Sequence, residues 1–556
     1  MKIKKILSLL RECYPNLKPF IGQNIAFIVS TELVVVLTLL VPLIIKFLLD
    51  DILVQNRWDI FPVFVVCMII AIVMSKSLSI ATNILYGRFS ANIEARARNL
   101  LFSCILKKNM EFFSTTADGE IVDRLMRSSE QLHTIPSIYL ERIISSITTF
   151  LIVSIILLSI HPVMAIFSLV SVPVFIWVYL KTRSLFFYQV QMAREESGKL
   201  TDFYLNIIRN IKQVKNYCSE SNEQKESEDR NNIIRSLCLR YSITGAFISN
   251  CVQIITQFNQ LGVLIYGSLL IRNGQITIGT LVAFYSYLEL LYQPIISVIQ
   301  ALYDMSDTLV GIERYLEYFN QEYEEDYDSN KVEVIRSNSI DFCDVSFSYG
   351  SQPIFKNISF HIGDSEKVLI CGKSGIGKST IVSLIKRFYP CSNGYIEIGG
   401  QNINYYNLVA LRKNIAYMTQ ENYFYPTTIK ENFIRINPNI SDAEIDRILC
   451  AVRLYHDIYG FKMGLNTSLE KNAVTFSGGQ RRRLNLALVL ASTAPIVILD
   501  EPFIGIDKNT QDQIWLDIRE LFHNKTVIVI DHHFRDKNYF NKIIEIDGNN
   551  NVVIQH

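Results

Sequence analysis

The stretch GKSGIGKST, Gly372 to Thr380, decides the fold of the second half of this 556-residue chain. It fits the pattern G-x-x-x-x-G-K-[ST] in full, follows the short apolar segment KVLICG, and opens the segment STIVSLIKRF, which has helical character. A glycine-rich loop between a buried strand and a helix surrounds phosphate groups with its backbone N–H groups, and the helix dipole favours the negative charge. The stretch therefore predicts an α/β P-loop domain that binds a nucleotide.

Two side chains of this loop have predicted tasks. Lys378 would neutralise the β- and γ-phosphates, and Ser379 would be a ligand of Mg²⁺. The loop residues expected at the nucleotide are Gly372, Lys373, Ser374, Gly375, Ile376, Gly377, Lys378, Ser379 and Thr380.

A second apolar segment, PIVILDEPF, ends in two acidic residues, Asp500 and Glu501. Asp500 is placed to organise Mg²⁺, and Glu501 is placed to orient and activate a water molecule for attack on the nucleotide. An apolar run ending in Asp-Glu is a moderate signal alone. Together with the glycine loop it predicts hydrolysis of ATP.

Weaker signals come from two more segments. TVIVIDHHF ends in His532 and His533, and a histidine at the C-terminal edge of a strand can reach a γ-phosphate. The pattern does not choose between the two. Gln420 also follows a predicted strand, which by itself indicates little.

The stretch FSGGQRRR, Phe476 to Arg483, predicts a second anion site. Ser477 and the amides of Gly478 and Gly479 stand at the start of a helix, where N–H groups favour an anion. Because the first loop already surrounds its phosphates from one side, we expect this site to cover the nucleotide of another copy of the chain. Two copies would then enclose two ATP molecules with two-fold symmetry.

The composition excludes some classes of function. Lys and Arg number 54 against 53 Asp and Glu, so nothing indicates a nucleic-acid partner bound by bulk charge. The ten cysteines show no CxxC pair or zinc-like spacing, so we expect reduced, structural thiols.

The first three hundred residues contain six apolar segments that are each long enough to cross a bilayer. One such segment could be a buried core helix, but six in succession predict a membrane domain. The predicted spans are 20–49, 59–86, 138–160, 163–181, 243–271 and 278–305.

The distribution of positive charge predicts the orientation of these spans. The three short connectors carry only Arg57 and Arg272, whereas the two long connectors are rich in Lys and Arg. Positive residues remain on the cytoplasmic side of a membrane. We therefore expect a multi-pass protein of the cytoplasmic membrane with both termini in the cytoplasm and a basic amphipathic helix at its N-terminus.

The two long connectors have helical periodicity with a break in the middle. The breaks lie in FFSTTADGE, Phe112 to Glu120, and, less clearly, in LNIIRNIKQ, Leu205 to Gln213. A helical arm of about 20 residues extends roughly 30 Å. Each hairpin therefore needs something to contact in the cytoplasm.

These motifs together resemble ATP-binding cassette (ABC) transporters, specifically half-transporters of the exporter type, over essentially the whole chain. GKSGIGKST is similar to Walker A, ILDE to Walker B, and FSGGQ to the ABC signature, with Phe476 in place of the usual Leu. The resemblance implies ATP and Mg²⁺ as cofactors, and a homodimer as the assembly, with a heterodimer as an alternative.

The resemblance also gives meaning to weaker signals. Tyr349 matches the aromatic residue that stacks on adenine, and Gln420 matches the Q-loop residue that reaches Mg²⁺. His532, rather than His533, matches the switch histidine. Asp507 matches the D-loop acid. The residues expected to contact the nucleotide of the other copy are Ser477, Gly478, Gly479, Gln480 and Asp507.

The membrane half is similar to the family too. Its first connector resembles a loop that ends in a coupling helix docked on the nucleotide-binding domain.

Two departures from the family pattern, both in the second half of the chain, bear on how tightly two copies couple. Phe503 to Ile506 replace the usual Thr-Ser-Ala-Leu before Asp507, and Lys471 stands where Glu is common.

Polar residues within the spans are candidates for the lining of a substrate cavity, because buried polar groups in membrane helices face a cavity or a partner. Four amides of the fifth span recur on one helical face. The alternative is that the amides hold helices together and the charges pair with one another. The candidates are Glu32, Asn250, Gln253, Gln257, Gln260 and Glu289.

An amide-rich cavity with one or two acids favours export of a peptide or peptide-derived natural product as the leading hypothesis. A lipid or lipid-linked sugar flippase and a multidrug exporter are alternatives. An ATP-gated channel or regulator is an alternative from a different class, against which the intact Glu501 argues, because pumping requires turnover.

The predicted fold is a multi-domain one, an all-α six-helix transmembrane domain followed by an α/β P-loop ATPase domain. We expect the transmembrane domain at 1–320, an acidic linker at 321–336 and the nucleotide-binding domain at 337–556.

Overall fold

The computed structural model of the chain contains two compact units. The first comprises residues 1–104 and 119–320, and the second comprises residues 105–118 and 321–556. The predicted domain boundaries at 320 and 336 remain predictions. The residues that the structure describes are 3–324, 332–350, 352–373, 375–469, 476–531, 534, 537–546 and 552–555.

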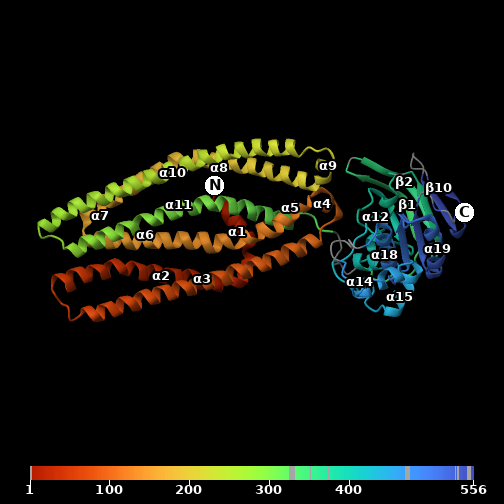
Figure 1. Cartoon of the computed structure of the whole chain (residues 1–556), viewed down its shortest axis with the longest axis horizontal. Helices are drawn as coiled ribbons and strands as arrows, with labels where there is room; N and C mark the ends of the chain where they lie inside the picture. Colours follow the sequence, from red (N-terminus) through yellow and green to blue (C-terminus); the bar gives the residue numbers. More distant parts are fainter. Residues whose placement is uncertain are drawn as a thin grey trace. The chain divides into compact units, whose positions relative to one another are not determined.

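Six helices in the described part of the first unit are long and apolar enough to cross a membrane, which confirms the predicted membrane domain (Figure 1). The long helices are α2 (Ile21–Phe47), α3 (Phe61–Leu106), α6 (Leu140–Ile160), α8 (Ser171–Arg209), α10 (Glu220–Arg272) and α11 (Ile278–Asn320). The shorter ones are α1 (Ile3–Leu17), η1 (Lys18–Phe20), η2 (Leu48–Val54), α5 (Asp118–Asp123), η3 (Arg124–Ser128), η4 (Gln131–His133), η5 (Ile135–Tyr139), α7 (Pro162–Leu169) and α9 (Ile211–Asn216).

The predicted span 163–181 is not one helix. Helix α7 ends at Leu169 and α8 begins at Ser171. Pro173 lacks the N–H group that would bond to the carbonyl of Leu169, so the regular ladder stops between these residues. Residues Pro162–Arg209, which include both helices, still form one candidate membrane span, as predicted.

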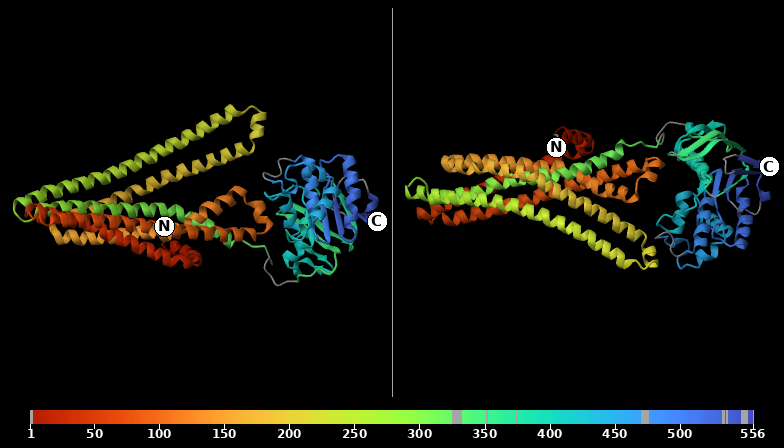
Figure 2. Two further views of the ribbon diagram at one scale, coloured as in Figure 1. Left: turned by 60° about the horizontal axis from the view of Figure 1, so that its bottom comes forward. Right: turned by 90° about the horizontal axis from the view of Figure 1, so that it is seen from above.

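Several helices run far beyond a bilayer. Helix α10 has 53 residues, which correspond to about 80 Å at the rise of an α-helix. The hydrocarbon core is only about 30 Å thick, so the polar half of α10 extends out of it. Helices α8 and α10 lie side by side, and α9 links them (Figures 1 and 2).

Both predicted breaks in the connectors are present. The chain bends between α4 (Met110–Thr115) and α5, and again on either side of the short helix α9. The first break lies within the range Phe112–Glu120 predicted for it, and the second follows Arg209, within the range Leu205–Gln213.

Hydrogen bonds join α11 to η2, which follows α2, and to α2 itself. The carboxylate of Asp50 accepts bonds from the N–H of Gly279 at 2.9 Å and from the hydroxyl of Thr277 at 2.5 Å, so it caps the start of α11. The buried hydroxyl of Tyr287 donates to the carbonyl of Leu39 at 2.6 Å. These bonds fix which face of α11 is turned toward α2 and which remains exposed.

The second unit contains two sheets. A four-stranded antiparallel sheet has the order β2-β1-β4-β5, and a six-stranded sheet has the order β10-β9-β3-β8-β7-β6, parallel except for β10. The strands are β1 (Ile340–Tyr349), β2 (Gln352–Ile362), β3 (Lys367–Gly372), β4 (Asn393–Ile398), β5 (Gln401–Asn402), β6 (Ile415–Met418), β7 (Ile496–Asp500), β8 (Thr526–Ile530), β9 (Lys542–Ile546) and β10 (Val552–Gln555). Among its described residues, the helices of four residues or more are α4, α12 (Lys378–Ile385), α13 (Leu408–Lys413), α14 (Ile429–Ile436), α15 (Asp442–Ala451), α16 (Tyr455–Tyr459), α18 (Gly478–Leu490) and α19 (Lys508–Arg519).

The parallel sheet is buried on both faces, which explains why its strands are continuous apolar runs. In β8, Val527 and Val529 pack on one face, whereas Ile528 and Ile530 pack on the other. The first face is covered by helices that include α14, α15 and α18, and the second by α12 and the four-stranded sheet. This predicted P-loop ATPase fold is confirmed.

The segment 105–118 packs within the second unit. The N–H of Glu324 donates to the carbonyl of Lys107 at 2.8 Å, and the ammonium of Lys108 donates to the carbonyl of Gln321 at 2.5 Å. Farther along, the side chain of Ser114 in α4 hydrogen-bonds to Tyr389. Helix α4 is therefore in contact with the nucleotide-binding fold, as the resemblance implied for a coupling helix.

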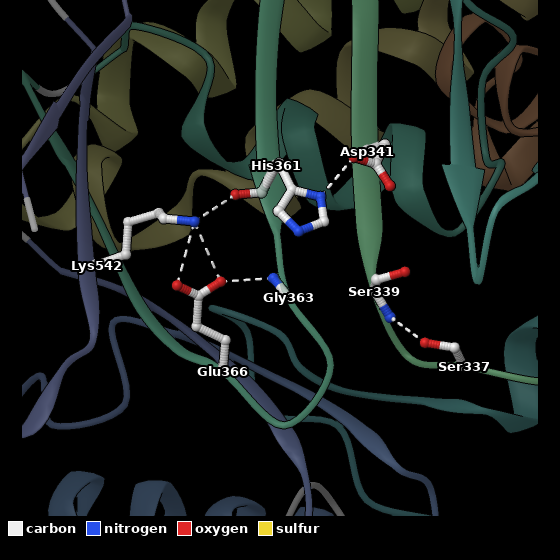
Figure 3. A network of polar contacts seen from close by, with 7 residues as sticks. All are labelled: Ser337, Ser339, Asp341, His361, Gly363, Glu366 and Lys542. Carbon is white, nitrogen blue, oxygen red and sulfur yellow. Dashed lines mark hydrogen bonds and ion pairs between the residues drawn. The ribbon is translucent and has the colours of Figure 1, made fainter.

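A polar network joins the two sheets (Figure 3). The ammonium of Lys542, at the start of β9, donates to the carbonyl of His361 in β2 at 2.8 Å and contacts the carboxylate of Glu366 at 3.1 Å. Glu366 also accepts the N–H of Gly363 at 2.5 Å. The side chains of Lys542 and Glu366 are both mostly buried, so each charge depends on the other for its neutralisation.

We expect Lys542→Met to lower the stability of the nucleotide-binding unit by about 2 kcal/mol, because the mostly buried carboxylate of Glu366 would lose its hydrogen-bonding partner. Thermal unfolding of the purified protein measures this change. The control is Lys430→Met, which breaks an exposed pair with Asp442 and should cost below about 1 kcal/mol. Equal effects of the two substitutions would contradict the prediction.

Candidate functional site

The glycine loop connects β3 to α12, the strand and helix expected around it. Gly377 caps α12 with φ of +99°, and a Cβ atom there would lie 2.5 Å from Ile354 and 2.8 Å from the ring of Phe355. Gly375 also has a positive φ, of +79°. The loop conformation therefore requires glycine at both positions. Ser374 lies outside the described residues.

Lys378 is buried beneath this loop. Its ammonium donates to the carbonyls of Gly372 and Lys373 at 2.9 Å each. Burial lowers the pKa of Lys378, and the nearby carboxylates of Glu501 and Asp500 oppose that shift. The cation is thus held at the loop by backbone oxygens, in the position from which it would neutralise phosphate charge.

Ser379, Asp500 and Tyr417 meet at the end of the parallel sheet. The hydroxyl of Ser379 donates to Asp500 at 2.7 Å, and the hydroxyl of Tyr417 donates to the same carboxylate oxygen at 3.3 Å. Burial and the charge of Asp500 raise the pKa of Tyr417. The sequence placed Ser379 and Asp500 at one site, but gave no indication of Tyr417.

These oxygen donors fit Mg²⁺, which favours hard oxygen ligands and shares them with water and substrate phosphates. In the described part of the chain, no three His, Cys, Asp or Glu side chains form a cluster that could hold a metal by themselves. Ser379 and Asp500 would therefore hold the ion together with nucleotide oxygens rather than in a closed protein cage.

Gln420 and Glu501 are brought together from different segments. The amide of Gln420 donates to the carboxylate of Glu501 at 3.1 Å. Glu501 has φ of +47°, a rare value for a residue with a side chain, and its N–H bonds to the carbonyl of Ile530 at 2.8 Å. Such strain persists where the surroundings determine the conformation, as at catalytic positions. His532 lies outside the described residues.

The signature stretch begins helix α18. Ser477 caps the helix: its hydroxyl accepts the N–H of Gln480 at 3.2 Å, and the side chain of Gln480 accepts the N–H of Ser477 at 2.9 Å. Gly478 faces open space, whereas Gly479 lies close to the carbonyl of Gly505. Gln480 therefore caps its own helix in this structure. The predicted contact with a nucleotide would be a second role of the same residue.

The unusual D-loop sequence has a local explanation. Phe503 is buried and packs edge-on against Trp515 at 6.2 Å, and Gly505 adopts a positive φ of +76° in the turn. Asp507 caps α19 by accepting the N–H of Thr510 at 3.0 Å, and this bond lowers the pKa of Asp507. Phe503 thus fills the core, and Gly505 forms the turn that positions Asp507.

Tyr349 ends β1 and remains 39% exposed. Its ring lies edge-on to Tyr389 at 5.1 Å and to Phe347 at 4.8 Å. The two contacts hold the ring in place while part of it stays accessible, which suits stacking on a base.

The polar residues of the membrane unit differ in accessibility. Asn250, Gln253, Gln257 and Glu289 are exposed in the isolated chain, and Gln260 is half-buried. In contrast, both carboxylate oxygens of Glu32 are inaccessible to solvent. The candidates of α10 and α11 thus face outward, whereas Glu32 faces inward among the helices.

Besides Tyr417, sequence reasoning missed a second residue of the site. Arg482 in α18 is 3% exposed and donates hydrogen bonds to four backbone carbonyls beside Gln420 and Glu501. The available signal was position, because Arg482 lies two residues before Leu484, where the apolar run that packs on the sheet begins.

Comparisons with known proteins agree along most of the chain. A family model described as the ABC transporter transmembrane region matches residues 25–295, and one described as ABC transporter matches residues 355–504. A relative from Bacillus subtilis (strain 168), named "Putative multidrug export ATP-binding/permease protein YgaD", is 25% identical over 524 residues, which cover 92% of this chain and 90% of the relative.

A protein of Staphylococcus aureus (strain NCTC 8325 / PS 47) with the same descriptive name is 25% identical over 546 residues, which cover 96% of this chain and 94% of that protein. Among solved structures, a bacterial Atm1-family ABC exporter with ATP bound has a TM-score of 0.81 at 20% identity. The superposition covers 95% of this chain and 93% of the other. That likeness supports the fold.

Proposed function

Because the chain belongs to the ABC transporter superfamily, as an exporter-type half-transporter that hydrolyses ATP, we propose that it exports amphiphilic small molecules, preferentially cations. The leading hypothesis of peptide export finds no support in the names of the relatives. The multidrug alternative fits those names, so it replaces the peptide hypothesis.

The observation that carries this proposal is an exposed polar stripe on α11. Tyr285, Glu289 and Gln293 recur at intervals of four residues and are exposed, whereas Tyr287 and Leu288 between them are buried in the core of the membrane unit. Glu289 lies near the centre of the span Ile278–Val298. A carboxylate turned toward lipid at that depth would cost several kcal/mol, so it should face a water-filled cavity.

The exposed amides of α10 are further candidates for the lining of this cavity. Asn250, Gln253 and Gln257 are exposed in the isolated chain, and no Lys or Arg occurs between Arg240 and Arg272. The proposed cavity therefore carries hydrogen-bonding groups and the negative charge of Glu289. Such a surface favours an amphiphilic cation over an anion.

We propose that two copies of the chain form the transporter in the cytoplasmic membrane, with both termini in the cytoplasm. Each glycine loop would hold one ATP, and Ser477 and Gly479 of the other copy would cover its phosphates. A heterodimer remains the alternative. Binding of two ATP molecules would close the nucleotide-binding domains, and alternating access would follow through α4 and its counterpart on the second connector.

The proposed roles at the nucleotide follow from the contacts. Lys378 would neutralise phosphate charge, and Ser379 and Asp500 would hold Mg²⁺, which would supply charge stabilisation during phosphoryl transfer. Glu501, oriented by Gln420, accepts a proton from the attacking water. Tyr349 stacks on the base. His532 and Asp507 keep the roles implied by the resemblance.

The test is the ATPase activity of the purified protein in lipid nanodiscs, titrated with tetraphenylphosphonium and, separately, with a neutral amphiphile of similar size. We expect stimulation by the cation, and Glu289→Gln should raise its half-maximal concentration about 10-fold, as for loss of one charge contact. The neutral compound serves as the control, because its half-maximal concentration should be the same in both proteins.

Other outcomes would identify the alternatives. Stimulation by a lipid fraction alone would favour a flippase, and stimulation by a peptide fraction alone would restore the peptide hypothesis. Ion conductance on addition of ATP without sustained turnover would favour a channel. An unchanged response of Glu289→Gln to the cation would remove Glu289 from the substrate site.

A further inference from the structure

A buried arginine connects the signature helix to the segments that carry Gln420 and Glu501. Arg482 lies in the second turn of α18, five residues after Ser477. One terminal nitrogen of its guanidinium donates to the carbonyls of Thr419 and Gln420, both at 2.8 Å. The other donates to the carbonyls of Asp500 and Glu501, at 2.5 and 2.7 Å.

The four carbonyls belong to the ends of two neighbouring parallel strands. Thr419 follows β6, and Asp500 ends β7, where the regular ladder of the sheet stops. Carbonyls at such ends need partners from elsewhere when they are buried. Burial lowers the pKa of Arg482, and the acids Asp500 and Glu501 oppose this shift.

The two terminal nitrogens of an arginine suit these four carbonyls better than the donors of a lysine or an amide do. A guanidinium has five N–H donors in a planar fork, an ammonium has three donors at one point, and an amide has two. One turn farther along α18, the amide of Asn485 also bonds to Asn422 at 3.1 Å. Helix α18 is therefore attached to the backbone at Gln420 and Glu501 and at the residue before each of them. The side chains of Gln420 and Glu501 lie 3.1 Å apart.

We propose that Arg482 is a positioning residue that links the two ATP sites of the transporter. This inference rests on the proposed head-to-tail dimer. There, Ser477 at the start of α18 contacts the nucleotide of the other copy, while Gln420 and Glu501 act on the nucleotide of their own copy. When Ser477 contacts the nucleotide of the other copy, α18 is held in place. Through Arg482, α18 then sets the positions of Gln420 and Glu501, which act on the nucleotide of their own copy.

The link predicts a specific change in kinetics. In the full-length protein in nanodiscs, we expect a Hill coefficient for ATP between about 1.5 and 2, near the limit for two coupled sites. Arg482→Gln should bring the coefficient to about 1 and lower kcat about 100-fold, as expected when reacting groups are misplaced. KM for ATP should change less than about 3-fold, because the glycine loop is untouched.

A graded series and a matched control separate positioning from simple loss of structure. Arg482→Lys retains the charge with fewer donors, so its kcat should lie between those of the wild type and Arg482→Gln. The control, Arg483→Gln, removes a half-buried arginine of the same helix that pairs with Asp457. It should lower the melting temperature without removing cooperativity.

Two results would overturn the inference. One is a Hill coefficient that is the same in the wild type and in Arg482→Gln. The other is a fall in kcat that only parallels losses of nucleotide affinity and melting temperature.

A separate experiment tests the dimer itself. With Ile376→Cys and Ser477→Cys in a Glu501→Gln chain, ATP should promote a disulfide between copies. Absence of this disulfide would reject the proposed dimer. If the disulfide still forms when Arg482→Gln is added, while Arg482→Gln abolishes cooperativity for ATP, the proposed link through Arg482 is supported.

Discussion

Glu501→Gln should lower the steady-state ATPase rate by about 10³-fold while leaving ATP binding intact, because removal of a general base costs about 10²–10⁴-fold in rate. The amide is nearly the same size as the carboxylate, so the contact with Gln420 at 3.1 Å and the bond from the Glu501 N–H to Ile530 can persist. The variant should therefore bind ATP and remain in the closed state.

The measurement is phosphate release at saturating ATP, together with the dissociation constant of a fluorescent ATP analogue. Glu545→Gln is the matched control, since it makes the same chemical change at an exposed position of β9 and should keep full turnover. Turnover above about a tenth of the wild-type rate in Glu501→Gln would reject the role of Glu501 as the base.

Gly377→Ala should weaken ATP binding by at least about 100-fold, as expected when a 1 Å displacement disturbs a preorganised site. The new Cβ atom would be 2.5 Å from Ile354 and 2.8 Å from Phe355, in a residue whose φ is +99°. Side chains other than glycine rarely adopt that conformation. The loop must therefore move, and the N–H groups that would surround the phosphates move with it.

The control for this variant separates backbone strain from the clash. Gly400 has φ of +73° in the turn between β4 and β5, but nothing lies within 4 Å of its Cβ position. Gly400→Ala should cost about 1–2 kcal/mol of stability without changing the affinity for ATP. Equal affinity for ATP in Gly377→Ala and the wild type would show that the loop tolerates the clash.

Local patterns in the chain account for much of the fold. The glycine loop with its flanking strand and helix, the six spans and the two breaks in the connectors are all present near the predicted residues. These features depend on interactions between residues close in sequence, such as helical periodicity and the backbone freedom of glycine. Within the fourth span the structure has a turn at Val170, which the missing N–H of Pro173 explains.

Contacts between distant segments could not be predicted to the same degree. Ser379 and Asp500 are 121 residues apart, and only the strand order β3-β8-β7 places them 2.7 Å from each other. For this pair, the family resemblance stood in for the topology. No motif predicted Tyr417, whose hydroxyl donates to the same carboxylate from β6.

The sequence by itself therefore determined the class of the protein, the position of its nucleotide loop and the number of its spans, because each follows from short-range pattern and composition. Only the tertiary structure decided which face of α11 is exposed and which four carbonyls Arg482 joins. Those facts depend on how the helices pack and in what order the strands lie, and such long-range pairings are set by burial of the whole core rather than by any one segment.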